Sequence, residues 1–173
     1  DKLGATVHAG WWDDRGPSGE DLADVSRFFE LIGIKQWSLQ HYKKQKTQAS
    51  NVLISSAPEC WQGDENGAHF GFKHDVGASP GLFLDQRIQR QWVNQNSRGL
   101  KVLNLFAYTG GFSVMAAIGG AETVVTVDLS KKYLEWAKDN FRLNNLPPEQ
   151  YKFYDMDSRE YLKYAAKKEL FFD

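Results

Sequence analysis

Residues 101–113, which read KVLNLFAYTGGFS, constrain the fold more than any other stretch of the chain. A short apolar, partly β-branched run ends in Thr109-Gly110-Gly111, and a second apolar run follows. The first run is typical of a buried parallel strand, and glycine lets the backbone turn sharply and approach a ligand closely. The sequence therefore predicts strand, glycine turn and helix, the first unit of a nucleotide-binding α/β domain. Its ligand would lie at the carboxyl ends of the strands, beside a helix N-terminus.

The next segment predicts a second buried strand over residues 123–127, ending at Asp128. An acid in this position can accept hydrogen bonds from both hydroxyls of an adenosine ribose, and the alternative is a plain turn residue. Ser130 then predicts the N-cap of a helix whose inward face repeats at i, i+3, i+4, i+7 and i+8. That face consists of Tyr133, Trp136, Ala137, Asn140 and Phe141, with Asn140 as its one polar member.

The turn itself indicates which adenosine cofactor fits. A dinucleotide site has the pattern G-x-G-x-x-G, which lets the backbone approach a pyrophosphate. The three glycine positions are occupied here by Phe106, Tyr108 and Gly110. Two large aromatics disfavour a pyrophosphate, and with it a nicotinamide dehydrogenase. They favour S-adenosylmethionine, which carries no phosphate.

Four segments together resemble bacterial large-subunit ribosomal RNA methyltransferases, the class I enzymes that methylate cytosine C5 or guanine N7 of 23S RNA. The resemblance covers about residues 66–173 and, weakly, the region before them. It implies a Rossmann-like class I fold, S-adenosylmethionine as cofactor, ribosomal RNA as partner and a cytoplasmic location. The segments are GLFLDQR at 81–87, LNLFAYTGG at 103–111, VDLS at 127–130 and YLEWA at 133–137.

The same resemblance implies a set of cofactor-binding residues. Arg87 could bind the methionine carboxylate bidentately, or instead form an ion pair with Asp85 or another acid. Asp157 lies where the family has the acid that accepts the adenine amine, and it could also cap a helix over 158–168. No catalytic residue is assigned, because the family's substrate-contacting motif would follow Asp173. The expected cofactor site comprises Phe83, Arg87, Phe106, Ala107, Tyr108, Thr109, Gly110, Phe112, Asp128, Leu129, Ser130, Asp157 and Ser158.

Residues 1–64 predict a small α+β appendage, and residues 65–173 a cofactor domain that is incomplete after the start of a fourth strand at 171–173. In the appendage we expect strands within 3–12, 34–42 and 51–55. A helix from Glu20 to Gly33 should place Leu22, Val25, Phe28, Phe29 and Ile32 on its apolar side. Asn66-Gly67 favours a tight hairpin turn before a strand over 68–73. Farther on, Asp85 could cap a helix whose apolar side includes Ile88 and Trp92.

Lys43, Lys44 and Lys46 form a basic tip without an acid, close in sequence to Trp37 and Tyr42. Lysines can neutralise phosphates and aromatic rings can stack on unpaired bases, so the tip is a candidate RNA-binding site. The alternative is a solvated turn. A net charge of -1 gives no overall attraction to nucleic acid, so any RNA site must be a local patch.

The remaining composition restricts the chemistry. Cys60 is the single cysteine, which excludes an internal disulfide and fits a reducing cytosol. We expect it to be a semi-buried structural thiol rather than the nucleophile of C5 methylation. The four histidines lack metal-ligand spacing, and no apolar run is long enough to span a membrane. Alternative functions are a fragment that binds cofactor or RNA without catalysis, and a methyltransferase for a small molecule or a protein.

Overall fold

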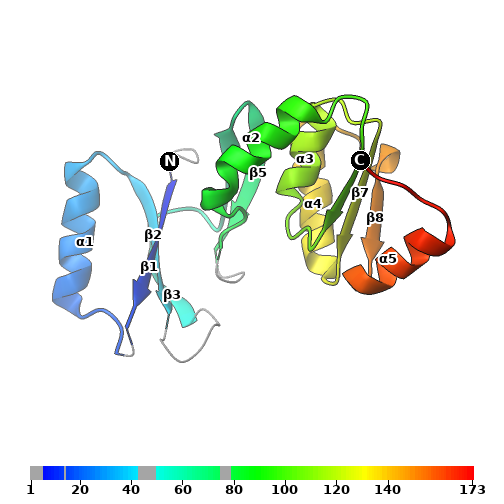
Figure 1. The fold of residues 1–173 in the computed structure, drawn as a ribbon. Coiled ribbons are helices and arrows are strands. Elements are labelled where there is room, and N and C mark those ends of the chain that lie inside the picture. Colours follow the sequence, from blue (N-terminus) through cyan, green and yellow to red (C-terminus); the bar gives the residue numbers. More distant parts are fainter. Residues whose placement is uncertain (1–5, 14, 43–49, 75–78) are drawn as a thin grey trace. The chain divides into compact units, whose positions relative to one another are not determined.

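The structure is a computed structural model that describes residues 6–13, 15–42, 50–74 and 79–173. The chain forms two compact units (Figure 1): unit 1 contains residues 1–64 and 72–82, and unit 2 contains residues 65–71 and 83–173. The chain passes between the units twice within one hairpin, β4 (Cys60–Glu65) and β5 (Ala68–Lys73), and once more after Leu82. Its tight turn is the one that the sequence predicts, since Asn66 and Gly67 both have positive φ, as a type I′ turn requires.

Unit 1 contains a three-stranded sheet covered on one face by a helix. Its strands are β1 (Thr6–Trp12), β2 (Gln36–Tyr42) and β3 (Ser50–Ser55), with β1 parallel and β3 antiparallel to β2. Helix α1 (Gly19–Leu31) begins with a capping box in which the side chains of Ser18 and Asp21 accept each other's backbone N–H. Phe29 of α1 packs with Trp37 and Leu39 of β2 in the core of this unit.

The inward face of α1 is narrower than the sequence pattern predicts. Leu22, Val25 and Phe29 pack against the sheet. Phe28 and Ile32, which we expected beside them, are 57% and 53% exposed. A helix of this length covers a three-stranded sheet with one stripe, so the residues at the border of the apolar arc face solvent.

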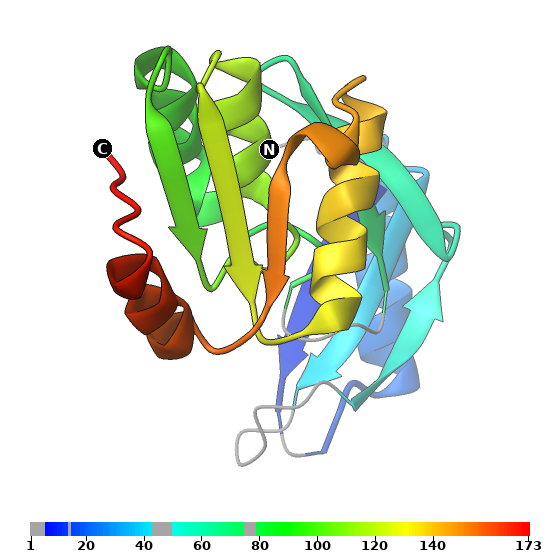
Figure 2. The ribbon, with the colours of Figure 1, turned by 90° about the vertical axis from the view of Figure 1, so that its right-hand side faces the viewer.

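Unit 2 contains a parallel sheet of β6 (Lys101–Leu105), β7 (Thr123–Asp128) and β8 (Lys152–Asp155), with β7 in the centre (Figure 2). Helices α3 (Gly111–Ile118) and α4 (Lys131–Leu143) lie on one face and α5 (Ser158–Lys167) on the other (Figure 1). Short 3-10 turns, η1 (Leu84–Gln86) and η2 (Pro148–Gln150), precede α2 (Arg87–Asn96) and β8. This alternation of parallel strands and crossover helices confirms the Rossmann-like fold predicted from the sequence.

Alternate residues of the central strand face opposite layers. Val125 and Val127 pack with Tyr161 and Ala165 on the α5 side. On the α3 side, the buried Thr126 hydroxyl donates to Ser113 Oγ at 2.8 Å. A period of two along a strand produces this division, and the buried hydroxyls are satisfied by each other.

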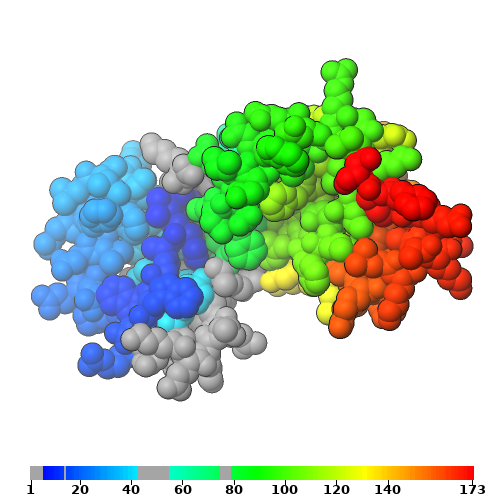
Figure 3. All heavy atoms as spheres, in the orientation of Figure 1, coloured from blue at the N-terminus to red at the C-terminus, as the bar shows by residue number. Residues whose placement is uncertain are grey.

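Helix α2 is oriented differently from the prediction. Ile88 and Trp92, expected on its buried side, are 70% and 63% exposed, and Figure 3 shows this green segment at the surface of unit 2. The buried residue is Arg90, which an apolar pattern would place outside. Asp85 does not cap the helix: α2 follows η1, and its N-cap residue, Gln86, makes no side-chain capping bond.

Two further expectations are wrong. Cys60 is exposed rather than semi-buried, because the alternation of β4 places it on the same outward face as Gln62 and Asp64. Residues 171–173 do not form a strand. Asp173 lies beside the first residue of β6: its N–H donates to the Lys101 carbonyl at 3.0 Å, and its carboxylate accepts from the Lys101 N–H at 2.8 Å.

Candidate cofactor site

The turn between β6 and α3 has an unusual backbone. Phe106, Tyr108 and Gly110 have φ values of 54°, 52° and 74°, so alternate residues adopt the left-handed conformation. Glycine reaches this region without strain, whereas bulky side chains rarely do. Such strain persists only where the surroundings fix it, and it is concentrated at ligand-binding and active sites. The three positions are those that glycines occupy in a dinucleotide-binding turn.

Asp128 fixes this turn to the end of β7. Its Oδ2 accepts the Tyr108 N–H at 2.8 Å, and its Oδ1 accepts the Ser130 N–H at 2.8 Å. The Ala107 N–H adds a bond to the Val127 carbonyl at 3.0 Å. An ionised carboxylate has about four acceptor positions, so Asp128 retains capacity for hydroxyl donors of a ligand. Asp128, the predicted acceptor of the ribose hydroxyls, therefore also stabilises the turn.

Gly110 packs directly against α4. A Cβ built at this residue would lie 2.7 Å from the Ala137 Cβ, a distance that real side chains do not reach. Positive φ and close approach both require glycine here. The third glycine of the G-x-G-x-x-G pattern allows close helix–strand packing in dinucleotide-binding turns. Gly110 occupies that position here and likewise allows close packing.

Aromatic side chains surround the turn. The Tyr108 ring lies 5.3 Å from that of Phe83 and 4.5 Å, edge-on, from that of Tyr133. At the same edge of the sheet, Phe106 and Leu129 are 78% and 72% exposed. Exposed apolar groups next to an acid suit an adenosine, whose base is flat and apolar and whose ribose donates hydroxyls. The donor and acceptor set therefore fits S-adenosylmethionine.

The end of β8 completes this edge. The Met156 N–H donates to the Asp128 carbonyl at 3.2 Å, which joins the loop after β8 to β7. Asp157 caps α5 as predicted, accepting from the N–H groups of Arg159 and Glu160 at 2.9 and 3.3 Å. The bond from the Arg159 N–H is the main cause that holds the pKa of Asp157 below its ordinary value, so this carboxylate is ionised and able to accept a further donor.

The structure thus brings most of the predicted site together at the carboxyl ends of the three strands. Arg87 is the first residue of α2 and half-buried, and Phe112 stands in the first turn of α3 with the Arg90 guanidinium 6.0 Å from its ring centre. The sequence pattern placed Tyr133 only on an apolar helix face, whereas the structure brings its ring against Tyr108 of the turn. All thirteen predicted residues stay predictions as cofactor ligands, among them Phe83, Ala107, Thr109, Ser130 and Ser158.

The predicted RNA-binding tip cannot be placed in the same way. Lys43, Lys44 and Lys46 lie outside the described residues. Trp37 and Tyr42, expected to stack on bases beside them, are only 6% and 3% exposed, so that part of the prediction is wrong. Tyr42 instead stacks on the Trp12 ring, with ring centres 4.3 Å apart.

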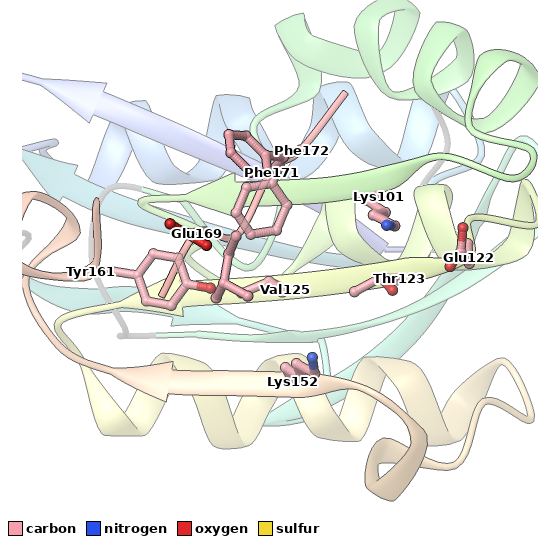
Figure 4. A pocket seen from close by; sticks show the side chains of 10 residues that line it. Lys101, Glu122, Thr123, Val125, Lys152, Tyr161, Glu169, Phe171 and Phe172 are labelled. Atoms are coloured by element: carbon pink, nitrogen blue, oxygen red, sulfur yellow. The ribbon is translucent and has the colours of Figure 1, made fainter. Parts of the chain in front are cut away.

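A separate cavity of about 320 Å³ lies on the α5 side of the sheet (Figure 4). Lys101, Thr123 and Lys152, the first residues of the three strands, line it, so it is remote from the carboxyl edge. Tyr161 also lines it, and burial, with smaller contributions from Tyr154 and Tyr164, raises the pKa of its hydroxyl to about 12. This group is a neutral phenol at physiological pH.

The described part of the chain contains neither a membrane-spanning helix nor a metal site. None of its helices has the length and apolar character to cross a membrane. Within the same residues, no three His, Cys, Asp or Glu side chains are grouped so that they could hold a metal ion.

A family model described as S-adenosylmethionine-dependent methyltransferase matches residues 25–163, which is most of the chain and includes every segment of the site. The chain belongs to this methyltransferase family. Its membership confirms the cofactor predicted from the two aromatics in the turn. It also confirms the resemblance on which the expected site was based.

Similar proteins agree with this assignment. The "Ribosomal RNA large subunit methyltransferase K/L" of Pseudoalteromonas translucida is 41% identical over 72% of the chain, and that of Shewanella oneidensis is 50% identical over 57%. The chain spans only 18% and 14% of the lengths of these two relatives. A protein from Streptococcus mutans described as a SAM-dependent methyltransferase superposes with a TM-score of 0.81 and 30% identity, over 99% of this chain and 45% of its own. A similar structure with the same score was determined in complex with S-adenosylhomocysteine.

Proposed function

We propose that this chain is the cofactor-binding part of a cytoplasmic methyltransferase that acts on a base of large-subunit ribosomal RNA. The observation that carries the proposal is the 41% identity, over 72% of the chain, to a relative named for that activity. Bound cofactor would supply an electrophilic methyl group on a sulfonium, and the protein would hold that methyl group in line with the target atom.

Each side chain at the carboxyl edge has a proposed role. Asp128 accepts the ribose hydroxyls, and Asp157 accepts the adenine amine. Phe106 and Leu129 cover the faces of the adenine ring, and Arg87 binds the methionine carboxylate. The geometry favours these roles because the acids already accept backbone N–H groups, so their orientation does not have to be set by the ligand.

The base that accepts the methyl group, cytosine C5 or guanine N7, is part of the proposal. Methylation at C5 requires a thiolate that attacks C6, whereas guanine N7 is itself a nucleophile. Cys60, the single cysteine of this chain, lies in strand β4 within unit 1, whereas the methyltransferase sheet belongs to unit 2. Nucleoside analysis of 23S RNA methylated by the full-length protein would decide between the two bases.

Calorimetry tests the cofactor part of the proposal. S-adenosylhomocysteine should bind, and NAD should bind far more weakly, because Phe106 and Tyr108 occupy positions where a pyrophosphate needs glycine. Both titrations use the same protein preparation, so misfolding affects them equally. Equal or tighter binding of NAD would contradict the argument from the two aromatics.

The RNA part concerns the appendage at residues 1–64, which we propose contacts RNA through Lys43, Lys44 and Lys46. Replacing all three with glutamine should flatten the slope of log K against log salt by roughly 2–3 units, at about 0.7–0.9 per phosphate contact. Cofactor affinity should stay unchanged. Filter binding with a 23S RNA fragment measures the slope.

A matched control replaces three exposed lysines at the end of α5 with glutamine: Lys163, Lys167 and Lys168. This control should leave the slope nearly as it is. If RNA affinity and its salt slope survive the replacement at the tip, the tip is a solvated turn and RNA contacts another surface.

A further inference from the structure

Side chains of α4 act as a partner for the free edge of strand β5. Asn144 accepts the His69 N–H at 2.8 Å and donates to the His69 carbonyl at 2.7 Å. One turn earlier, Asn140 accepts the Gly71 N–H at 2.9 Å. One turn before Asn140, the Trp136 indole N–H donates to the Gly71 carbonyl at 3.1 Å. Residues four apart share a helix face, and residues two apart share a strand edge, so the two patterns match. The helix thus satisfies the strand edge as a neighbouring strand would.

The Asn144 Nδ2 also donates to the backbone carbonyl of Asn140 at 2.7 Å, whereas the side chain of Asn140 bonds into the cofactor turn. The Asn140 Nδ2 donates to the carbonyl of Thr109 at 2.9 Å, inside the strained turn. The side chain is 1% exposed, so both bonds are shielded from water. The amide orientation is fixed, because the Gly71 N–H can only donate and the Thr109 carbonyl can only accept. A primary amide is the group that offers an acceptor and a donor side by side for such a pair.

We propose that Asn140 is a positioning residue that clamps the cofactor turn to Gly71 of strand β5. The left-handed conformations of Phe106 and Tyr108 require support from their surroundings. Asp128 supplies it from the β7 side through the Tyr108 N–H, and Asn140 supplies it from the α4 side through the next carbonyl. The inference rests on the proposed function in that the turn is taken to bind S-adenosylmethionine. It makes residues 65–71, the part of the hairpin that belongs to unit 2, a support of the cofactor site.

The chain offers a matched pair of variants. Asn140→Asp keeps an acceptor for Gly71 but, as a carboxylate, cannot donate to the Thr109 carbonyl and repels it. Asn144→Asp makes the corresponding change against the carbonyls of His69 and Asn140, neither of which belongs to the turn. Both should lower thermal stability, but only Asn140→Asp should weaken binding of S-adenosylhomocysteine, by about tenfold at neutral pH in calorimetry.

Protonation should restore the clamp. Burial and the facing carbonyl raise the pKa of the carboxyl introduced at position 140. Below that pKa its O–H can donate to Thr109, so the affinity of Asn140→Asp should approach that of the wild type as the pH falls. His69 on the facing strand and Asp128 beside the turn are ionisable side chains present in both proteins, so variant and wild type are compared at each pH. Asn144→Asp should show no such recovery of affinity.

A second readout needs no ligand. In Asn140→Asp the amides of residues 106–110 should exchange with deuterium faster than in the wild type, and in Asn144→Asp they should not. If Asn140→Asp does not fold at neutral pH, the shorter, uncharged Asn140→Ser replaces it in both measurements. Equal affinities for the two asparagine variants, or unchanged exchange in the turn, would overturn the clamp. Failure of the wild type to bind S-adenosylhomocysteine would overturn the proposed function, and the exchange measurement would still decide on the clamp.

Discussion

Replacing Glu65 with leucine should lower the free energy of unfolding of unit 2 by about 3–5 kcal/mol. Glu65 and Arg90 form a buried bidentate ion pair, with Nε and Nη2 of Arg90 at 2.6 and 2.7 Å from the two carboxylate oxygens. Only 2% of the Arg90 and 1% of the Glu65 side chain is exposed. Removing one partner leaves the other charge buried without compensation, and this accounts for the size of the expected effect. Urea unfolding followed by circular dichroism measures it.

A double-mutant cycle separates the pair from its surroundings. Arg90→Met alone should cost a similar amount, since it also leaves the Phe83 carbonyl without the 2.8 Å bond from Nη1. The double variant should be more stable than the sum of the single losses predicts, because neither charge is left alone. Glu160→Gln is the matched control: its 2.7 Å pair with Lys163 is exposed, so its loss should cost less than about 1 kcal/mol. Losses that simply add would show that the two side chains do not act as a pair.

The same ion pair explains where the sequence pattern failed. Apolar spacing on α2 predicted Ile88 and Trp92 inside, yet the helix buries Arg90. The partner of Arg90 lies 25 residues upstream, in the β4 strand. Periodicity reports only on one element at a time, so a charged residue that is buried by a distant partner is invisible to it. The prediction that Cys60 is semi-buried failed for a related reason. The exposed face of β4 depends on which distant residues pack on the strand, and the sequence of β4 alone does not show this.

The cofactor edge was predictable because its signals are local. A strand followed by a glycine turn fixes where the carboxyl edge lies, and the acids at 128 and 157 follow their strands directly along the chain. The left-handed backbone at Phe106 and Tyr108 was not predictable, since bulky residues seldom adopt it. The polar member of the α4 face, Asn140, did carry a signal. An amide within an apolar stripe needs partners for both its ends, and here the partners are Gly71 and Thr109.

Asp128→Ala should weaken the binding of S-adenosylhomocysteine by about 1–3 kcal/mol, the range for leaving buried donors unpaired. Part of the loss comes from the ligand, whose ribose hydroxyls lose their acceptor. The other part comes from the turn, because the Tyr108 and Ser130 N–H groups lose the carboxylate that both contact at 2.8 Å. Asp128→Asn should fall between the wild type and Asp128→Ala, since one carbonyl oxygen remains to accept. Calorimetry on the three proteins gives the order.

Asp155 provides the control within the same sheet. It pairs in register with Asp128 on the neighbouring strand, and it is exposed. Asp155→Ala therefore removes an equal charge at the same edge without touching the turn, and cofactor affinity should stay within about twofold of the wild type if the effect of Asp128 depends on its hydrogen bonds. Equal losses for the two variants would instead point to the general negative potential of the edge. An unchanged affinity in a folded Asp128→Ala variant would show that Asp128 is only a turn residue and does not bind the ribose. The ribose would then need another acceptor along the ends of the strands.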